Sequence, residues 1–204
     1  MIGILDTGPL WTLTLRRPEK ANSLTRTMLE GLARTVRRAT AEGARAIVLT
    51  GEGKVFSAGA DLDEARAGLA TAPVWEELSG AIAGFPGLTI AALNGTLAGG
   101  AMGMALACDI RLAVPSAKFF YPVMKLGFLP QPSDPARLAR LVGPSRARMI
   151  LMGGAKVEAP EALAWGLIDR IVPPEDLLAA AQALAADTLA ASPEHAAAIK
   201  RLVP

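Results

Sequence analysis

The stretch Asn94-Gly95-Thr96-Leu97-Ala98-Gly99-Gly100 follows a mostly apolar run, Thr89–Leu93, and leads into small residues that continue to Ala107. A short apolar run that ends in asparagine and glycine is typical of a strand buried on both faces of a sheet. The glycine pair lets the backbone approach a ligand closely. It also opens the predicted helix 100–107, where unpaired N–H groups and the positive end of the helix dipole face outward. These residues predict a strand, a ligand-facing loop and a helix in direct succession.

A second loop of the same kind occurs earlier in the chain. Ser57–Leu62 (SAGADL) lies shortly after Ala46–Thr50, another mostly apolar run. If the two strands are neighbours in a parallel sheet, both loops lie at its carboxyl edge, where open α/β sheets place ligands. Two backbone N–H donors that converge from two loops form an oxyanion hole. We therefore expect a ligand site between these loops.

The glycines in these loops have two other possible interpretations besides a ligand site. Gly99, Gly100 and Gly103 are superficially similar to a dinucleotide-binding fingerprint, but Ala98 stands at the first glycine position. The acidic residue expected at the end of the following strand is also missing, since Asp109 lies at its start. Glycines that serve only tight turns are the other alternative for each loop taken alone.

The rest of the chain alternates between strand and helix patterns, which predicts an α/β fold with parallel crossovers. Met28, Leu32 and Val36 recur every four residues and form one apolar helical stripe after the N-cap candidates of Asn22–Thr25. Further strands are predicted at 11–15, 109–114 and 167–172, and further helices at 73–85, 135–142, 145–153, 160–165 and 174–190. A polar tail is expected after Pro193.

Composition excludes several classes of protein. The chain has 204 residues, 51% of them hydrophobic and 20% charged, so we expect one domain with apolar surface buried against other subunits. The net charge is +2 with scattered basic residues, which does not indicate nucleic-acid binding. Cys108 and His195 are the only cysteine and histidine, which argues against disulfides, metal clusters and histidine-based triads.

The stretch 78–108 carries no charged residue and is long enough to span a bilayer. Pro86 and the glycine turns at 94–95 and 99–100 divide it into pieces that are too short to do so. Met1–Leu15 also lacks the basic start of a signal peptide. We therefore expect a soluble, cytoplasmic protein that does not bind membranes.

Four separated motifs together resemble the crotonase (enoyl-CoA hydratase/isomerase) superfamily in order and spacing. They are Arg17–Leu24, Ser57–Leu62, Asn94–Ile110 and Ala164–Ile168. The resemblance implies a spiral of ββα units, with an acyl-CoA-binding core at 1–143 and a helical oligomerisation segment at 144–204 that assembles a homotrimer or a dimer of trimers. It implies coenzyme A as part of the substrate, with no permanently bound cofactor and no metal. The tail after Ser192–His195 is shorter than is usual in the family.

The resemblance also assigns roles to individual positions. The thioester carbonyl would lie between the backbone N–H groups of Ala60 and Gly100, an oxyanion hole. Ala58, Ala60 and Leu62 match positions that line the adenine pocket. Lys20 and Ala21 lie where the first loop of the family meets the coenzyme.

The chain departs from the family at the catalytic acids. The two glutamates of family hydratases fall on Gly103 and Val123, neither of which can transfer a proton. An aspartate used by some isomerases and by a dehalogenase branch falls on Gln131. Because acid–base catalysis contributes roughly 10²–10⁴-fold, we do not expect a simple hydratase.

Asp134 and Tyr121 are the candidates that could replace these acids. The alternative for Asp134 is a first-turn or N-cap aspartate beside Pro135, and the alternative for Tyr121 is an aromatic core residue near Phe119 and Phe120. Two functions follow. One is an enzyme of the lyase or isomerase type that acts on acyl-CoA through an enolate or a related oxyanion. The other is a non-catalytic acyl-CoA-binding or scaffold protein with the same fold.

Overall fold

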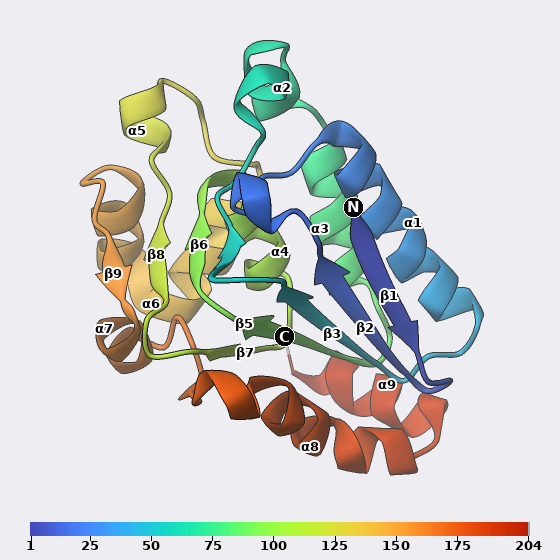
Figure 1. Cartoon of the computed structure of the whole chain (residues 1–204). Helices are drawn as coiled ribbons and strands as arrows, with labels where there is room; N and C mark the ends of the chain where they lie inside the picture. Colours follow the sequence, from blue (N-terminus) through green and yellow to red (C-terminus); the bar gives the residue numbers. More distant parts are fainter. Residues whose placement is uncertain (204) are drawn as a thin grey trace.

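A six-stranded sheet forms the centre of the computed structural model, which describes residues 1–203 (Figure 1). Its order is β1-β2-β3-β5-β7-β10, and only β1 runs antiparallel to its neighbour. The strands are β1 (Ile2–Asp6), β2 (Leu10–Leu15), β3 (Ala46–Gly51), β5 (Leu88–Leu93), β7 (Ile110–Ala113) and β10 (Arg170–Ile171). The predicted α/β class is confirmed.

A second sheet of four short strands lies beside the first. Its order is β4-β6-β8-β9, with β4 (Val55–Ser57), β6 (Thr96–Ala98), β8 (Lys118–Phe120) and β9 (Val157–Glu158). Strands β3, β5 and β7 of the first sheet are followed along the chain by β4, β6 and β8 of the second. This succession of strand pairs and helices gives the predicted spiral of ββα units.

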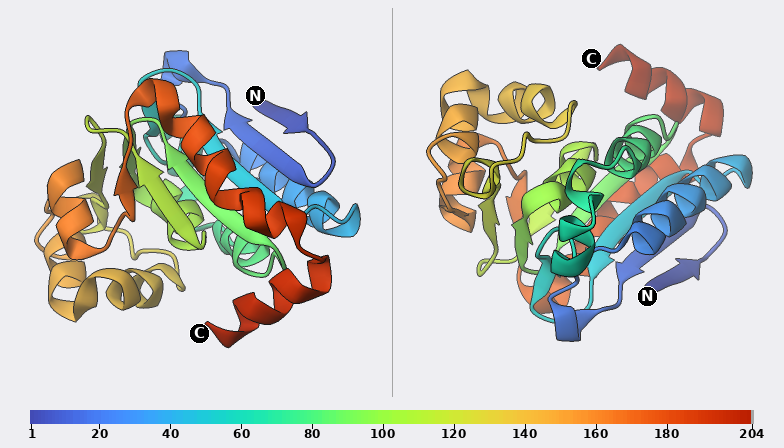
Figure 2. Two further views of the ribbon diagram at one scale, coloured as in Figure 1. Left: turned by 90° about the horizontal axis from the view of Figure 1, so that it is seen from below. Right: turned by 90° about the horizontal axis from the view of Figure 1, so that it is seen from above.

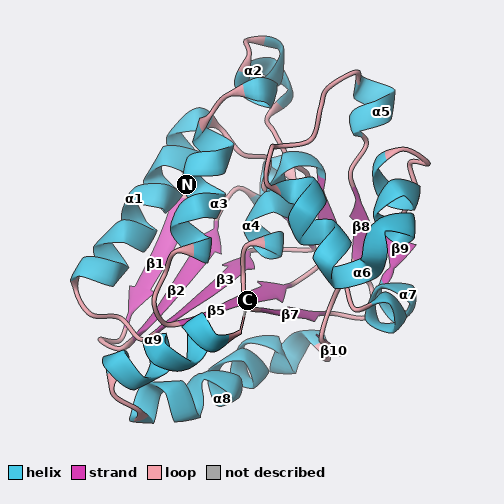
Figure 3. Cartoon of the chain, turned by 180° about the vertical axis from the view of Figure 1, so that it is seen from behind, coloured by secondary structure: helices cyan, strands magenta, loops and turns pink. Residues whose placement is uncertain are grey.

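Helices cover both faces of the six-stranded sheet (Figures 2 and 3). Helices α1 (Arg26–Ala41), α3 (Val74–Ala83) and α4 (Met102–Leu106) pack against one another on one face, and α8 (Leu177–Ala190) crosses β3, β5 and β7 on the other. Helix α1 begins where the Thr25 hydroxyl accepts a hydrogen bond from the Met28 N–H at 3.2 Å. The predicted apolar stripe of α1 is buried.

The remaining helices lie around the edges of the two sheets. They are α2 (Leu62–Arg66), α5 (Val123–Leu126), α6 (Asp134–Leu151), α7 (Ala159–Trp165), α9 (Pro193–Leu202) and the 3₁₀ turns η1 (Pro18–Lys20), η2 (Leu69–Thr71), η3 (Gly99–Ala101) and η4 (Pro174–Asp176). Helices α2 and α5 project from the upper edge in Figure 1.

The structure differs from the predicted elements in three places. The expected polar tail after Pro193 is α9, whose first turn is capped by the Ser192 hydroxyl. The two helices predicted on either side of residue 143 are confirmed as the two halves of α6, which meet at a kink where Gly143 has φ 80° and ψ 159°. The predicted strand 167–172 pairs with β7 only at Arg170–Ile171. Strand β1 was not predicted because its apolar and polar residues do not alternate.

The boundary expected at residue 143 coincides with the kink in α6. Strands β9 and β10 follow it, and they pair with β8 and β7 of the preceding part of the chain. The helical C-terminal region is present. Its separate role in oligomerisation stays a prediction.

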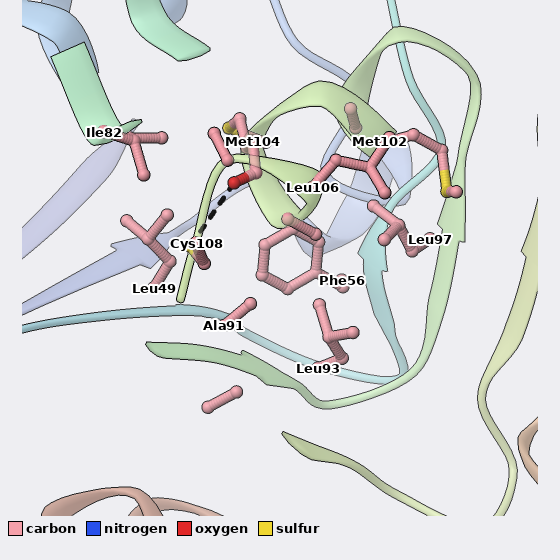
Figure 4. Close-up of a cluster of buried hydrophobic side chains, with 14 of the residues drawn as sticks. Leu49, Phe56, Ile82, Ala91, Leu93, Leu97, Met102, Met104, Leu106 and Cys108 are labelled. Atoms are coloured by element: carbon pink, nitrogen blue, oxygen red, sulfur yellow. Dashed lines mark hydrogen bonds between the residues drawn. The ribbon is translucent and has the colours of Figure 1, made fainter. Parts of the chain in front are cut away.

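The core lies between the central strands and helix α4 (Figure 4). Leu49, Ala91 and Leu93 from the sheet lie near Phe56 and Leu106. The uncharged stretch 78–108 is mostly buried and comprises the end of α3, the strands β5 and β6, η3 and α4, so it is divided into short pieces as predicted. No helix within residues 1–203 combines the length and the apolar character that a membrane crossing requires.

Gly95, in the turn between β5 and β6, lies against the backbone of Lys54, and it provides a test of the fold. A Cβ there would collide with the backbone carbonyl of Lys54, whereas a Cβ on the exposed Gly80 of α3 would meet nothing within 4 Å. We expect Gly95→Ala to lower the free energy of unfolding by about 1–3 kcal/mol or more. Gly80→Ala should raise it by about 0.5–1 kcal/mol, because alanine favours helices. Urea denaturation measures both changes, and equal effects would contradict the tight packing at Gly95.

Candidate active site

The two glycine-containing loops meet as the sequence predicts. Parallel pairing of β3 with β5 and of β4 with β6 places them side by side. Gly59 has φ 96°, and a Cβ on it would stand 3.0 Å from the Ala98 carbonyl oxygen and 3.4 Å from the Gly99 α-carbon. Only glycine accommodates both this conformation and this contact.

Two backbone N–H groups of these loops, those of Ala60 and Gly100, are the predicted oxyanion donors. Leu24 donates to the Gly59 carbonyl at 2.8 Å and accepts from the Asp61 N–H at 2.9 Å. Because this bridge bonds the residues on either side of Ala60, the Ala60 N–H points away from Leu24. Gly100 lies in the first turn of η3, where N–H groups have no acceptor inside the helix. Both residues are half-buried.

Two buried polar side chains hold this arrangement. The Asn22 side-chain amide donates to the carbonyls of Glu52 and Val55 at 2.9 and 2.7 Å. The Ser57 hydroxyl donates to the Asn22 carbonyl at 2.8 Å and accepts from the Gly59 N–H at 3.2 Å. Both side chains are buried, so their hydrogen bonds fix the loop from within. The sequence analysis identified Asn22 only as a candidate N-cap residue of the following helix.

The positions expected to contact the coenzyme lie along one edge. The Ala58 N–H donates to the Ala21 carbonyl at 3.0 Å, which joins the first loop to the second. Lys20 ends η1, Leu62 begins α2, and both are exposed. Ala58 and Leu62 are each two residues from Ala60 along the chain, and the bond from Ala58 brings Ala21 to the same loop.

Asp61 stabilises the same edge. It accepts from the Arg17 guanidinium at 2.8 Å and caps α2 by accepting from the N–H groups of Asp63 and Glu64. The hydrogen bond from Arg17 lowers the pKa of Asp61. Asp61 therefore has a structural role, as the partner of Arg17 and the N-cap of α2.

Asp134 and Tyr121 are in direct contact. The Tyr121 hydroxyl donates to Asp134 Oδ2 at 2.9 Å and accepts from the Gln131 N–H at 3.2 Å. The other carboxylate oxygen faces helix α4, where a Cβ on Gly103 would stand 2.8 Å from Asp134 Oδ1. Asp134 is the first residue of α6, but its side chain points inward and caps nothing.

The Asp134 carboxyl is almost completely buried, with 1% of its surface exposed. Burial raises its pKa from the ordinary 3.8 to about 6, against the opposing effect of the Tyr121 hydrogen bond. Burial likewise raises the pKa of Tyr121, so its hydroxyl stays protonated. In the described part of the chain, Asp134 Oδ1 and Arg137 Nη1 are the two buried side-chain atoms without a hydrogen-bond partner. Native proteins leave few buried polar atoms unpaired, so this oxygen requires an explanation.

Glu76 anchors the turn that carries Asp134. Its carboxylate accepts from the Ser133 N–H at 3.0 Å and from the Ser133 hydroxyl at 2.6 Å. The Gln131 side chain donates to the Ala70 carbonyl at 3.1 Å. These bonds tie the start of α6 to α3 and η2. Nothing in the sequence distinguishes Glu76 from an ordinary helix surface residue.

The other positions singled out in the sequence have structural contacts. Val123 and Gln131 are buried. Asp109 accepts from Thr89 and Lys200, and Cys108 is buried with its pKa raised to about 12 by loss of solvent.

Comparison with known proteins identifies the class. A sequence model of the enoyl-CoA hydratase/isomerase family matches residues 7–203. A probable enoyl-CoA hydratase of Mycobacterium tuberculosis is 37% identical over 193 residues, which cover 95% of this chain and 78% of that protein. A 4-chlorobenzoyl coenzyme A dehalogenase of an Arthrobacter species is 34% identical over 204 residues, which cover 95% of this chain and 74% of the relative.

A solved structure agrees with this assignment. An enoyl-CoA hydratase/carnithine racemase from Magnetospirillum magneticum matches 99% of this chain and 79% of its own, with a TM-score of 0.91 and 31% identity. The chain belongs to the enoyl-CoA hydratase/isomerase family, as its motifs predict. The names of its relatives include both a hydratase and a dehalogenase, so the family contains enzymes of more than one reaction type.

The raised pKa of Asp134 makes the stability of the protein depend on pH. Its folded-state pKa of about 6 exceeds the ordinary 3.8, so the folded state binds the proton more tightly. The stabilisation is complete below 3.8 and is lost as pH rises through about 6, roughly 3 kcal/mol in all. Between pH 5 and 7.5 we expect a loss of about 1–1.5 kcal/mol that Asp134→Asn abolishes. Urea denaturation at both pH values measures it, and an equal pH dependence in the variant would refute the assignment.

Proposed function

We propose that this protein binds an acyl-CoA thioester and stabilises negative charge on its carbonyl oxygen. The carbonyl lies between the N–H groups of Ala60 and Gly100, and the coenzyme follows the edge at Lys20, Ala21, Ala58 and Leu62. Charge on this oxygen grows as an enolate or related oxyanion forms, so the donors bind the transition state more tightly than the substrate. Family membership supports acyl-CoA as the ligand class.

The observation that carries a catalytic role is the Asp134 carboxylate beside Gly103. Position 103 is where the family resemblance expects a glutamate, and here a carboxylate from α6 fills the adjacent space. In the proposed step, Oδ1 takes a proton from the carbon next to the thioester carbonyl. The C–H electron pair forms the enolate, whose oxygen is held by the two backbone donors. Tyr121 keeps Oδ2 in place.

A site with a single carboxylate, that of Asp134, is better suited to proton transfer than to the addition of water. It can remove a proton and return it to the same or a neighbouring carbon. Water addition in family hydratases uses two acids, and the second position holds Val123. A pKa of about 6 leaves Asp134 ionised at neutral pH and close to the value that suits a general base. We therefore favour an isomerase-type reaction over simple hydration.

The expected assembly is a homotrimer or a dimer of trimers. Helices α6 and α7 pack together and expose Met149, Met152 and Leu163, at 47%, 60% and 41% of their surfaces. This apolar surface supports contacts between copies of the chain.

Ligand binding is the first test. Butyryl-CoA at a concentration of 100 times its Kd should add about 2.7 kcal/mol to the free energy of unfolding, which a thermal-shift titration detects as a rise in Tm. Free CoA and the butyl-CoA thioether, which lacks the carbonyl oxygen, are the matched controls. We expect both to bind about tenfold more weakly, because neither uses the two N–H donors. Equal stabilisation by thioester and thioether would contradict the oxyanion hole, and no stabilisation by any of them would contradict acyl-CoA binding.

The second test concerns Asp134 itself. In D₂O the wild-type protein should exchange the protons next to the butyryl-CoA carbonyl for deuterium, followed by mass spectrometry. Asp134→Asn should reduce this exchange by about 10²–10⁴-fold while keeping the affinity, because only the base is lost. Asp176→Asn, an exposed residue at the start of α8, is the control. Wild-type exchange in the Asp134 variant would remove it from the mechanism. Binding without exchange in the wild type would favour the non-catalytic alternative.

A further inference from the structure

A tryptophan ring covers the α-carbon of Gly100. A Cβ built on Gly100 would stand 3.3 Å from each of three atoms of the Trp75 six-membered ring, Cε3, Cζ2 and Cη2. Equal distances to separate atoms of one ring place its face, and not its edge, over the glycine. Trp75 lies in the first turn of α3, which packs against α4. The indole therefore lies beside the N–H group assigned to the thioester carbonyl.

The indole is fixed in this position. Its Nε1–H donates to the Leu69 carbonyl at 2.8 Å, and only 3% of the residue surface is exposed. Rotation away from Gly100 would leave a buried donor and a buried carbonyl without partners, which is costly. Trp75 thus acts as a rigid wall.

Trp75 and Asp134 lie over neighbouring glycines on the same face of η3 and α4. Gly100 and Gly103 are three residues apart on η3 and α4, so their missing side chains would lie on one helical face. The Trp75 ring covers the first glycine and the Asp134 carboxylate covers the second. An acyl chain that leaves a carbonyl at Gly100 with its first carbon near Asp134 must pass the indole.

We propose that Trp75 is a specificity-determining residue that restricts the substrate to short acyl groups, because further methylenes would need the space that the indole fills. This inference rests on the proposed acyl-CoA function of the same site. It adds the size of the acyl group and the residue that sets it.

Calorimetric titration with acetyl-, butyryl-, octanoyl- and lauroyl-CoA tests the proposal. In an open apolar pocket each added methylene tightens binding about fourfold. The wild type should instead bind octanoyl-CoA at least about tenfold more weakly than butyryl-CoA. Trp75→Leu should bind octanoyl-CoA about tenfold or more tightly than the wild type does, with little change for butyryl-CoA. Trp165→Leu, a half-buried tryptophan on α7, is the control and should keep the wild-type order.

The possible outcomes separate this inference from the function on which it rests. Wild-type affinity that rises with chain length overturns the role of Trp75, and this measurement needs no variant. An unchanged order in Trp75→Leu also overturns it. If that variant does not fold, Trp75→Phe, which keeps an aromatic ring, should show a smaller gain for octanoyl-CoA. Failure of every thioester to bind the wild type more tightly than free CoA would reject the proposed function instead.

Discussion

The close contact between the two glycine-containing loops depends on parallel pairing in both sheets at once. Leu49 lies opposite Ala91 in the larger sheet, and Ser57 lies opposite Leu97 in the smaller one. This double register brings Gly59 against Ala98 and Gly99, with no room for a side chain. Functional groups must be held within about 0.5 Å of a productive geometry. Two sheets joined through β3–β4, β5–β6 and β7–β8 meet this requirement better than flexible loops. The buried polar side chains here support the loop backbone, which in the proposed site supplies the N–H donors.

The position of Asp134 likewise depends on a glycine that leaves room for another element. Gly103 leaves a gap on the face of α4, and α6 fills it with a carboxylate. A side chain at position 103 would displace Asp134, so the two residues depend on each other. The arrangement costs stability at neutral pH because an ionised carboxylate is buried with one oxygen unpaired. Buried charged groups without full hydrogen bonding are expected at sites where function requires them.

Much of the fold could be predicted from the sequence because the long elements carry clear periodicity. The stripe of α1, the buried runs of β3 and β5 and the convergence of their loops are all present in the structure. The three-residue strands β4, β6 and β8 could not be predicted, since so few residues show no period and their pairing is set by the larger sheet. Helix α9 escaped prediction because only two of its ten residues, Ile199 and Leu202, are large and apolar, too few to show a helical stripe.

The candidate site was only partly predictable, for a similar reason. Asp134 and Tyr121 were each named, but their hydrogen bond joins residues on either side of a long turn, and only the folded chain shows it. Trp75 and Glu76 look like ordinary residues of an amphipathic helix. Their importance comes from what they face: the bare α-carbon of Gly100 and the N–H of Ser133. Sequence patterns report the face of a helix that is buried, but not which group of another element it meets.

The helix that follows the glycine pair supplies backbone to the site and no side chain. Gly100 admits an indole from α3, and Gly103 admits a carboxylate from α6. In the proposed site the oxyanion donors therefore stay constant, while the size of the acyl pocket and the position of the base come from separate elements. A change of the Trp75 side chain can alter the acyl group while Glu76, on the same helix, still holds the turn that carries the base. A change at the start of α6 can alter the chemistry without moving the donors. This separation provides a physical reason why one family fold can serve both a hydratase and a dehalogenase among the relatives of this chain.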